Sequence, residues 1–480
     1  MKVDILVAEI GSTTTVVNAF NGIDSASPAF IGQGQAATTV LEAEGVTLGL
    51  QNAVDALAAS LGEKTIEWGG MVATSSAAGG LRMTVHGLVY DMTVRAAKEA
   101  ALGAGANLHL TTAGVLNDHD LSEIERIDPN LILLAGGTDY GERETALTNA
   151  KLLTGLSVRP PVIYAGNVQN QAQIKEMLTA AGFKCTVVEN VYPRLDELNI
   201  EPTRKAIHRV FEEHITKAPG MGRVREMVSG TIMPTPGAVM ECAQLMYDAL
   251  GDLLVIDVGG ATTDVHSVTE GSEEIALMTV APEPRAKRTV EGDLGLYVNA
   301  RTVIELVGED EISREAGIDV PAVMARYQPI PTDDDQLKLA QALCWHASST
   351  ALARHAGHLR YIYGPSGRQT LAEGKDLTKV RWLIGTGGAL TRMPGREPIL
   401  ERLRDLNASG RMLLPKPGQM RVLQDNDYIM ASLGALSVHH PKAATALMLN
   451  SLGVDAAAAA QARAALQDES LQEEPQEEKA

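Results

Sequence analysis

The chain has 480 residues, 45% of them apolar and only 4% aromatic, and its 41 basic and 60 acidic residues give a net charge of −19. This length exceeds one simple core and predicts two to four domains. The acidic balance argues against nucleic acid as the main partner, because a phosphate backbone attracts a basic face.

Cysteine usage and the amino-terminal segment set two further expectations. Three cysteines, Cys185, Cys242 and Cys344, lie far apart with no CxxC pair, so an iron–sulfur or zinc site has no local support. No secretory signal or transmembrane span is predicted, and a membrane partner is not expected. We therefore expect a cytoplasmic protein with reduced thiols.

In chain order, the first predicted elements are two strands, residues 4–10 and 14–20, joined by a glycine turn. A helix is predicted over 48–62 and a strand over 69–76. This block is interpreted as the amino-terminal part of a first lobe, residues 1–83.

Short apolar strands then alternate with helices. This pattern predicts a mostly parallel sheet covered on both faces, interpreted as an α/β domain inserted at 84–217. Within it, Asp120 is the predicted N-cap of a helix over 120–127, with Glu123 at the capping-box position. The predicted strands are 107–113, 131–137, 161–167 and 184–190, and the other helices lie near 91–105, 142–154 and 170–181.

The second half, residues 218–452, is interpreted as a second lobe and a return to the first. A helix over 235–251 has Thr235 as its N-cap and Pro236 in its first turn. Further predicted elements are helices near 297–307, 336–357, 399–407 and 425–437 and a strand over 381–388. Residues 453–480 are predicted to form an Ala-rich helix and an acidic disordered tail.

Two segments of the chain resemble each other. "ILVAEIGSTTTVV" (5–17) and "LLVIDVGGATTDV" (253–265) agree at six of thirteen positions, and both run from an apolar strand through a carboxylate to glycine and paired threonines. Internal similarity of this kind predicts two similar half-domains facing each other across a cleft.

The residue types in these segments indicate phosphate and metal binding. Glycine lets backbone N–H groups approach a phosphate without a side chain in the way. Glu9 and Asp257 have the same charge as phosphate, so they are expected to act through a cation, with magnesium held through its waters as the usual arrangement. A third glycine turn, "GTGG" (385–388), follows another apolar strand, and no Walker A pattern is present.

Together the three turns resemble those of the actin/Hsp70/sugar-kinase ATPase superfamily. The resemblance implies a ribonuclease H-like fold with duplicated ATPase lobes, which binds ATP and Mg²⁺, with Glu9 and Asp257 as catalytic and metal-binding carboxylates. It also implies a role for each turn. Turn residues Gly11, Ser12, Thr13 and Thr14 would hold the β-phosphate, Gly259, Gly260, Thr262 and Thr263 would face the γ-phosphate, and Gly385, Gly387 and Gly388 would line the nucleoside.

The chain departs from that pattern at two places. The superfamily normally has Asp where this chain has Glu9, and it often has a catalytic carboxylate near the start of the first connecting helix, where this chain has Pro234. Glu241 is the nearest acid, one helical turn further on. Slow hydrolysis that serves a switch fits these departures better than rapid turnover.

Longer blocks resemble a narrower family, the GlmL/MutL family of glutamate mutase-associated proteins, which is unrelated to the mismatch-repair protein of similar name. The resemblance covers about residues 1–440 and includes "SSAAGGLRM" (75–83), "LILLAGGTDYG" (131–141), "LNIEPTRKAI" (198–207), "VIDVGGATTDVHSV" (255–268) and "RTVEGDLGLYVNA" (288–300).

This family resemblance implies an ATP-dependent reactivating factor for an adenosylcobalamin-dependent carbon-skeleton mutase. Such a chaperone-like protein would release damaged cobalamin from its partner, with the inserted domain as the contacting element. A small-molecule kinase and an actin-like scaffold are the alternatives. Which mutase is served stays open, as does the oligomeric state, with a homodimer as one option.

Several other polar residues admit two interpretations. Glu291 and Asp293, shortly after the second phosphate motif, would either join the outer shell of the metal or, for Asp293, cap a helix. Thr138 and Asp139 follow a strand end where parallel sheets bind ligands, although an Asx-type turn is the favoured interpretation.

Overall fold

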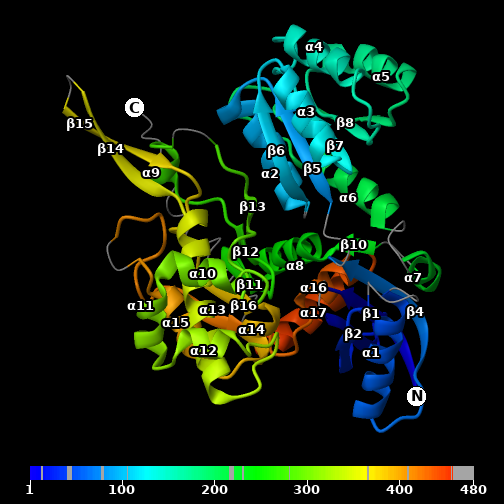
Figure 1. The fold of residues 1–480 in the computed structure, drawn as a ribbon, viewed down its shortest axis with the longest axis vertical. Coiled ribbons are helices and arrows are strands. Elements are labelled where there is room, and N and C mark those ends of the chain that lie inside the picture. Colours follow the sequence, from blue (N-terminus) through cyan, green and yellow to red (C-terminus); the bar gives the residue numbers. More distant parts are fainter. Residues whose placement is uncertain are drawn as a thin grey trace, which may run out of the picture. The chain divides into compact units, whose positions relative to one another are not determined.

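The structure is a computed structural model of the chain. It describes residues 1–11, 14–39, 46–76, 81–104, 106–215, 221–229, 232–279, 282–364, 367–407, 410–455 and 457. The chain divides into two compact units (Figure 1), Met1–Val239 with Ala281–Pro284, and Met240–Val280 with Arg285–Ala480. The predicted domain boundaries stay predictions, and most of the predicted carboxyl-terminal helix and tail lies outside the described residues.

The first unit opens with a five-stranded sheet in the order β10–β4–β1–β2–β3. Strands β1, β2 and β3 are antiparallel neighbours, and β4 and β10 continue the sheet in parallel with β1. Helix α1 (Val46–Ser60) packs on β2 and β3, and Gly34 leaves room for it, because a Cβ there would collide with the Ala53 carbonyl. The strands are β1 (Lys2–Ile10), β2 (Thr14–Asn21), β3 (Ala29–Ala37), β4 (Glu67–Ser75) and β10 (Ile232–Pro234).

A second five-stranded sheet of this unit is entirely parallel, in the order β6–β5–β7–β8–β9. Numbered within itself, this order is 2-1-3-4-5, that of a doubly wound flavodoxin-like sheet. The strands are β5 (Arg82–Gly87), β6 (Asn107–Ala113), β7 (Leu131–Leu134), β8 (Val162–Tyr164) and β9 (Cys185–Val187). We call this region, β5 to β9 with its helices, the inserted domain.

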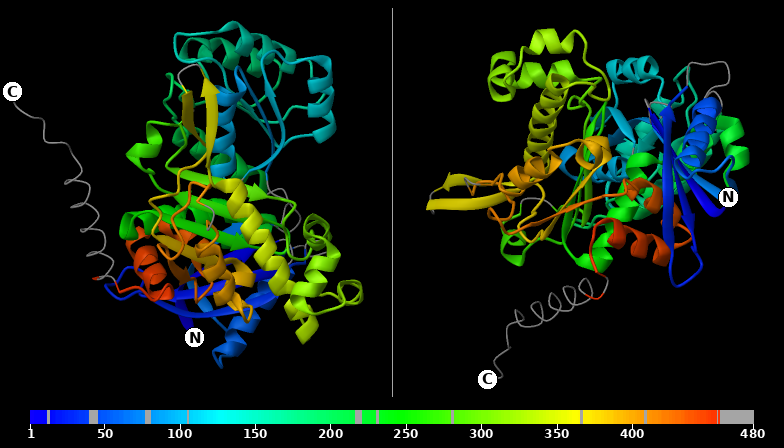
Figure 2. Two further views of the ribbon diagram at one scale, coloured as in Figure 1. Left: turned by 90° about the vertical axis from the view of Figure 1, so that its left-hand side faces the viewer. Right: turned by 90° about the horizontal axis from the view of Figure 1, so that it is seen from below.

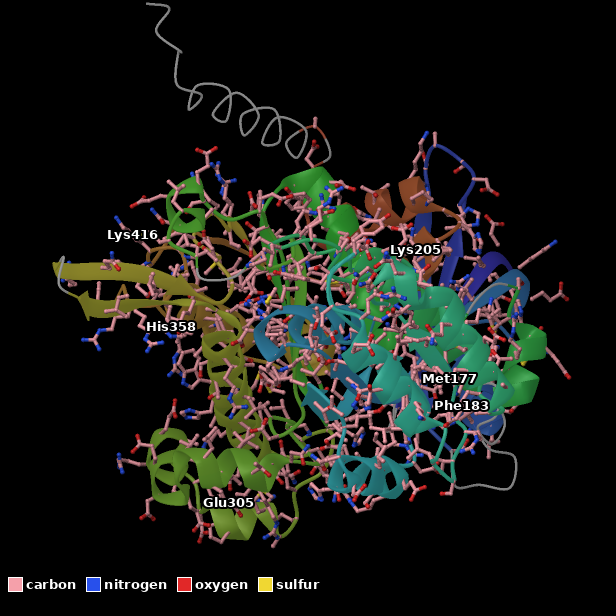
Figure 3. All side chains as sticks on the ribbon, turned by 90° about the horizontal axis from the view of Figure 1, so that it is seen from above. Met177, Phe183, Lys205, Glu305, His358 and Lys416 are labelled. Carbon is pink, nitrogen blue, oxygen red and sulfur yellow. The ribbon has the colours of Figure 1, made fainter. Side chains whose placement is uncertain are left out.

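Helices cover both faces of this parallel sheet, as the alternating pattern predicts. Residues such as Val85 and Leu133 pack in one cluster with α2 and α6, and Ile132 and Leu134 pack in another with α3, α4 and α5. Met177 and Phe183, marked in Figure 3, belong to the second cluster. The helices are α2 (Arg95–Gly103), α3 (Asp118–Ile127), α4 (Glu144–Leu153), α5 (Gln171–Ala180) and α6 (Glu201–Ile215), with short turns η1 (Tyr90–Val94) and η2 (Val168–Asn170), and α7 (Met221–Met227) follows.

The cap of α3 differs from the prediction. Asn117, not Asp120, is the N-cap, and its side chain accepts hydrogen bonds from the N–H groups of His119 and Asp120. Asp120 is the capping-box partner and accepts from the Asn117 N–H. The helix therefore begins two residues earlier, and Glu123 instead pairs with Arg126. Asn117 and Asp120 are each followed by an acidic residue three positions later, so the sequence allows either of them as the N-cap.

The second unit contains a sheet in the order β13–β12–β11–β16–β17. Strands β11, β12 and β13 are antiparallel neighbours, and β16 and β17 continue in parallel with β11. Its strands are β11 (Leu253–Val258), β12 (Thr263–Val268), β13 (Ala286–Glu291), β16 (Trp382–Thr386) and β17 (Arg421–Gln424).

One face of this sheet forms the core of the unit. Leu254, Ile256, Val265 and Leu383 pack against a helical layer whose longest member is α13. The helices of the layer are α10 (Ala300–Val307), α11 (Glu309–Ala316), α12 (Val320–Met324), α13 (Asp334–His355), α14 (Gly387–Arg392) and α15 (Arg396–Arg404). The remaining helices are α8 (Thr235–Leu250), the one-turn α9 (Glu273–Ala276), α16 (Met430–Ser437) and α17 (Pro441–Ser451).

The first sheet of each unit has the same order and the same strand directions. Counted along the chain, both read 3-2-1-4-5, with three antiparallel strands followed by two parallel ones. This repeated topology confirms the predicted fold class, an actin-like, ribonuclease H-like duplication with an inserted α/β sheet.

Several elements were not predicted, and the most prominent of them is a β-hairpin of the second unit. Strands β14 (His358–Gly364) and β15 (Gly367–Glu373) form a hairpin that projects from the second unit (Figure 2). Near its middle, the Arg368 guanidinium lies 4.7 Å from the centre of the Tyr361 ring. No helix in the described part of the chain combines the length and the hydropathy of a membrane span.

Candidate functional site

The first glycine turn joins β1 to β2. The N–H of Gly11 donates to the carbonyl of Thr14 over 3.0 Å, and a Cβ on Gly11 would lie 2.6 Å from that carbonyl oxygen. The turn itself therefore requires glycine. Ser12 and Thr13, the predicted tip of the turn, lie outside the described residues.

The second glycine turn joins β11 to β12 and has the same closing bond. The Gly259 N–H donates to the Thr262 carbonyl over 2.9 Å. Within the described residues, the N–H groups of Gly260 and Ala261 donate no hydrogen bond. A Cβ on Gly260 would meet nothing nearer than the Tyr297 Cβ at 3.8 Å, so internal packing does not explain this glycine.

The carbonyls of the same turn are occupied by one segment, residues 296–299. Backbone N–H groups of this segment donate to the carbonyls of Gly259 and Gly260, and the Asn299 amide donates to that of Ala261. With its carbonyls engaged and its tip N–H groups unbonded, the turn has the polarity that binds an anion.

Strand register places Glu9 and Asp257 at equivalent positions in the two sheets. Glu9 lies opposite Val16 in the antiparallel partner and beside Thr74 in the parallel one. Asp257 lies opposite Asp264 and beside Thr386. The alignment of the two segments made from sequence is therefore the alignment that the two hairpins adopt.

The surroundings of Asp257 are rich in charge. Burial raises the pKa of the Asp257 carboxyl to about 7, and the neighbouring carboxylates of Asp264 and Asp425 add to this rise while Arg288 opposes it. Asp264 is itself buried and pairs with the buried Arg288 over 2.8 Å. Asp257 and Asp264 therefore lie near one guanidinium, with Asp425 as a further carboxylate near Asp257, which leaves the surroundings of Asp257 short of positive charge.

The third glycine turn reaches Asp257 within the second unit. Gly387 has φ of 81°, and a Cβ there would collide with Oδ1 of Asp257 and the backbone of Val258. Gly388 is exposed with open space around it. A Cβ on Gly385, in contrast, would lie 2.9 Å from the Leu400 side chain. Packing accounts for Gly385 and Gly387, and Gly388 remains available at the surface.

Asp425 fixes the neighbouring strand ends and the start of α16. It accepts hydrogen bonds from the Thr386 and Ser451 hydroxyls and from the N–H groups of Ile429 and Met430. The helix predicted over 425–437 therefore begins later, at Met430.

Two amide side chains lie in a chain beside Glu9. The Asn18 amide donates to Glu9 over a long 3.4 Å, and the Gln33 amide donates to Asn18 over 2.8 Å. Glu9 is buried near the end of its strand, with this chain of amides beside it.

Three predicted polar residues have partners of their own. Glu291 and Asp293 both pair with Arg354 of α13, over 2.6 and 3.0 Å, and Asp293 does not cap a helix because α10 begins at Ala300. The buried Thr263 hydroxyl donates to the Leu294 carbonyl over 2.7 Å and would have to give up this bond to bind a phosphate. No group of three or more His, Cys, Asp or Glu in the described residues is arranged to hold a metal.

Sequence reasoning missed Asp264, Arg288, Thr386 and Asp425. Hairpin register would have found Asp264, because a turn closed by Gly259 and Thr262 places residue 264 opposite residue 257. Arg288 comes from a third strand across a long connection, and Asp425 from the fifth strand, so no local pattern marks either of them.

Comparison with known proteins identifies the relatives of the chain. It is 35% identical to "Protein MutL" of Clostridium tetanomorphum over 459 residues, which cover 92% of this chain and 98% of the relative. Two solved structures are similar at low identity: a nucleotide-free acetone carboxylase (11% identity, 91% of this chain and 70% of that one, TM-score 0.38) and a nucleotide-free diol dehydratase-reactivating factor (11%, 91% and 100%, TM-score 0.35). The family described as "MutL protein" matches residues 5–452, and the chain belongs to this family.

Proposed function

We propose that the chain is an ATP-dependent reactivating factor for an adenosylcobalamin-dependent carbon-skeleton mutase such as glutamate mutase, acting in the cytoplasm. The observation that carries the ATPase part is the duplication of one carboxylate-and-glycine hairpin in two sheets of identical topology. Membership of the MutL family supports the choice of partner.

The residues of the second hairpin fit a phosphate group. Two unbonded N–H groups at its tip, and a glycine that packing does not require, form a cradle that a side chain at Gly260 would enter. The deficit of positive charge around Asp257 fits a divalent cation, since carboxylates crowded together are stabilised by a metal as well as by a proton.

In this proposal each turn has a distinct role. Asp257 and Glu9 hold Mg²⁺ through its waters, because Mg²⁺ is usually bound through one or two carboxylates plus phosphate oxygens. The two hairpin turns hold the β- and γ-phosphates, and the third lines the nucleoside. The residues are Gly11, Ser12, Thr13 and Thr14; Gly259, Gly260, Thr262 and Thr263; and Gly385, Gly387 and Gly388.

When bound, magnesium neutralises phosphate charge and ATP supplies the free energy of hydrolysis. The chain supplies positioning: the buried pair of Asp264 and Arg288 fixes the strand opposite Asp257, and Asp425 ties the end of β16 to α16. The superfamily often has a carboxylate near the start of the helix that corresponds to α8, where this chain has Pro234. The absence of a carboxylate at this position favours slow hydrolysis.

Slow hydrolysis suits a switch that acts on a partner. If the ATP and ADP forms differ in affinity for the mutase, nucleotide turnover shifts the population between bound and released partner. The inserted domain is the element proposed to contact the mutase, and release of damaged cobalamin then admits an intact cofactor.

The test uses the full chain and purified glutamate mutase whose cobalamin has lost its adenosyl group. Recovery of mutase activity on addition of Mg-ATP and fresh adenosylcobalamin is the expected result, with a non-hydrolysable ATP analogue as the control. If activity is not recovered and the rate of phosphate release is the same with and without the mutase, the proposed partner is overturned.

The same incubation separates the alternatives. Phosphorylation of a small acceptor would identify a kinase, and sedimentable polymer would identify a scaffold. Phosphate release without acceptor or polymer is the outcome expected for the reactivating factor.

A further inference from the structure

Exposed apolar side chains gather at one edge of the inserted domain. Among the described residues, fourteen large apolar side chains are exposed, and six of these follow the carboxyl ends of β5 to β9. They are Val89 and Tyr90 after β5, Val115 after β6, Tyr140 after β7, Val168 after β8 and Leu195 after β9, with exposed fractions from 39% to 78%.

Parallel strands place these residues on a common edge. All five strands run in the same direction, so their carboxyl ends meet at one end of the sheet. Neighbouring strands lie about 4.8 Å apart, so the edge is roughly 20 Å wide. We call the loops at this edge, residues 88–91, 114–118, 135–144, 165–170 and 188–197, the carboxyl-edge surface.

Tyr140 is presented in a conformation that costs energy. Its φ is 62°, in the left-handed region that bulky residues rarely adopt, and its side chain is 78% exposed. A side chain this exposed gains little packing energy to offset the strain of its backbone. Backbone strain of this kind persists where surrounding contacts enforce it, and it gathers at functional sites.

Buried amides enforce the conformation. Asn167 accepts from the Tyr140 N–H over 3.2 Å and donates to the carbonyls of Gly141 and Glu142. Asn190 donates to the Gly137 carbonyl and, over 2.9 Å, to Asp139. The loops after β7, β8 and β9 are thus tied together, so this part of the surface, with Tyr140, is held in place before any partner arrives.

The same contacts argue against a small ligand at this edge. Asp139, which the sequence analysis weighed as a ligand-binding residue, accepts from the Val168 N–H and the Asn190 amide. A Cβ on Gly166 would lie 2.9 Å from the Tyr164 hydroxyl, so packing explains this glycine. The polar groups at the strand ends hold the loops, and the apolar groups face outwards.

The charge of the surface indicates the chemistry of its partner. Its loops contain eight acidic and two basic residues, and the acidic side chains other than Asp139 are exposed. An apolar centre with an acidic surround complements an apolar protein surface ringed by lysine and arginine.

We infer that the carboxyl-edge surface, anchored by Tyr140, is the docking surface for the mutase, whose complementary face is apolar and ringed by basic residues. This inference rests on the proposed function. Tyrosine is among the residues that most often dominate the binding energy of protein interfaces, and exposed tyrosines follow the ends of two of the five strands here.

The decisive variant is Tyr140→Gly in the full chain. Glycine adopts the backbone conformation of this position without the strain that a Cβ causes, which offsets its greater freedom in the unfolded chain, so the variant is expected to unfold at about the same temperature. Its Kd for glutamate mutase is expected to rise by about tenfold or more, the loss typical of a central interface tyrosine. Val115→Ser is expected to weaken binding less, and Tyr361→Ser on the β14–β15 hairpin is the matched control, with no change.

Every outcome bears on the inference. Equal binding by wild type, Tyr140→Gly and Val115→Ser would overturn the docking surface while leaving the proposed function intact. Absence of binding and of reactivation by the wild type would overturn both. A wild-type dimer that Tyr140→Gly dissociates would assign this edge to a second copy of the chain instead, and overturn the inference.

Discussion

The two hairpins that define the fold share their topology but differ in the residues around their carboxylates. Diagonal to Glu9 lies Asn18, which is paired with Val7 on one side and with Gln33 on the other, and the two amides are hydrogen-bonded to each other. Beside Asp257, the equivalent positions hold His266 and Arg288, and Asp264 replaces the apolar Val16 directly opposite.

The two units therefore have some features in common and differ in others. Strand order, the closing hydrogen bond of the turn and the carboxylate position are common to both units. In the second unit the carboxylate has further charge around it, and the pKa of the Asp257 carboxyl is raised to about 7. We therefore expect Asp257 to be the carboxylate that responds more strongly to a cation.

The largest expected effect comes from removing the charge of Asp257. Asp257→Asn keeps the shape of the side chain but not its charge, so kcat for ATP hydrolysis should fall by on the order of 10²–10³-fold. The matched variant Glu9→Gln should fall less, by roughly tenfold. Steady-state phosphate release by both variants measures the difference. Equal losses would mean that the two carboxylates contribute alike.

The buried ion pair predicts a large effect on stability. Arg288→Met leaves Asp264 buried beside the carboxyl of Asp257, and breaking such a pair is expected to cost about 3 kcal/mol of unfolding free energy. Gln33→Met at the equivalent position of the first unit removes one neutral hydrogen bond and should cost about 1 kcal/mol. Urea unfolding compares them. The double variant Arg288→Met with Asp264→Leu should recover most of the loss, and no recovery would contradict a charge-based cause.

Sequence alone carried the parts of this comparison that are local. The duplicated segments, the glycine turns and the positions of Glu9 and Asp257 follow from a pattern of thirteen residues, and the strand register agrees with it. The parallel sheet of the inserted domain followed from alternating short strands and helices. These features depend on neighbours in the chain.

The parts that sequence did not reveal depend on pairing across long connections. Arg288 lies opposite His266 only because β13 pairs with β12 after a connection of about 17 residues. Tyr140 is exposed because Asn167, from another loop, enforces its left-handed backbone. The β14–β15 hairpin was missed because its strands are largely exposed and lack the apolar runs that mark buried strands.

The raised pKa of Asp257 predicts a dependence of stability on pH. Between about pH 4 and pH 7 the folded protein holds a proton that the unfolded chain has lost. The corresponding stability is fully present below about pH 4 and is lost as the pH rises through 7. Solvent near this half-buried residue reduces the effect to the order of 1 kcal/mol.

Asp257→Asn removes this titration. In metal-free buffer it should be more stable than the wild type at pH 8, and the advantage should shrink towards pH 5. Thermal unfolding at several pH values measures the difference. A constant advantage at every pH would show that the carboxyl keeps its ordinary pKa in the folded protein.

The smallest expected effect concerns the length of the first carboxylate. Glu9→Asp restores the residue usual in the ATPase superfamily but draws the carboxylate back by about 1.5 Å, the length of one carbon–carbon bond. Since the bond from Asn18 is already long at 3.4 Å, little hydrogen-bond energy is lost, and kcat should change by less than about fivefold. Phosphate release measured beside Glu9→Gln checks this. If Glu9→Asp were as impaired as Glu9→Gln, the reach of the side chain would matter as much as its charge, and Glu9 would have to act at close range.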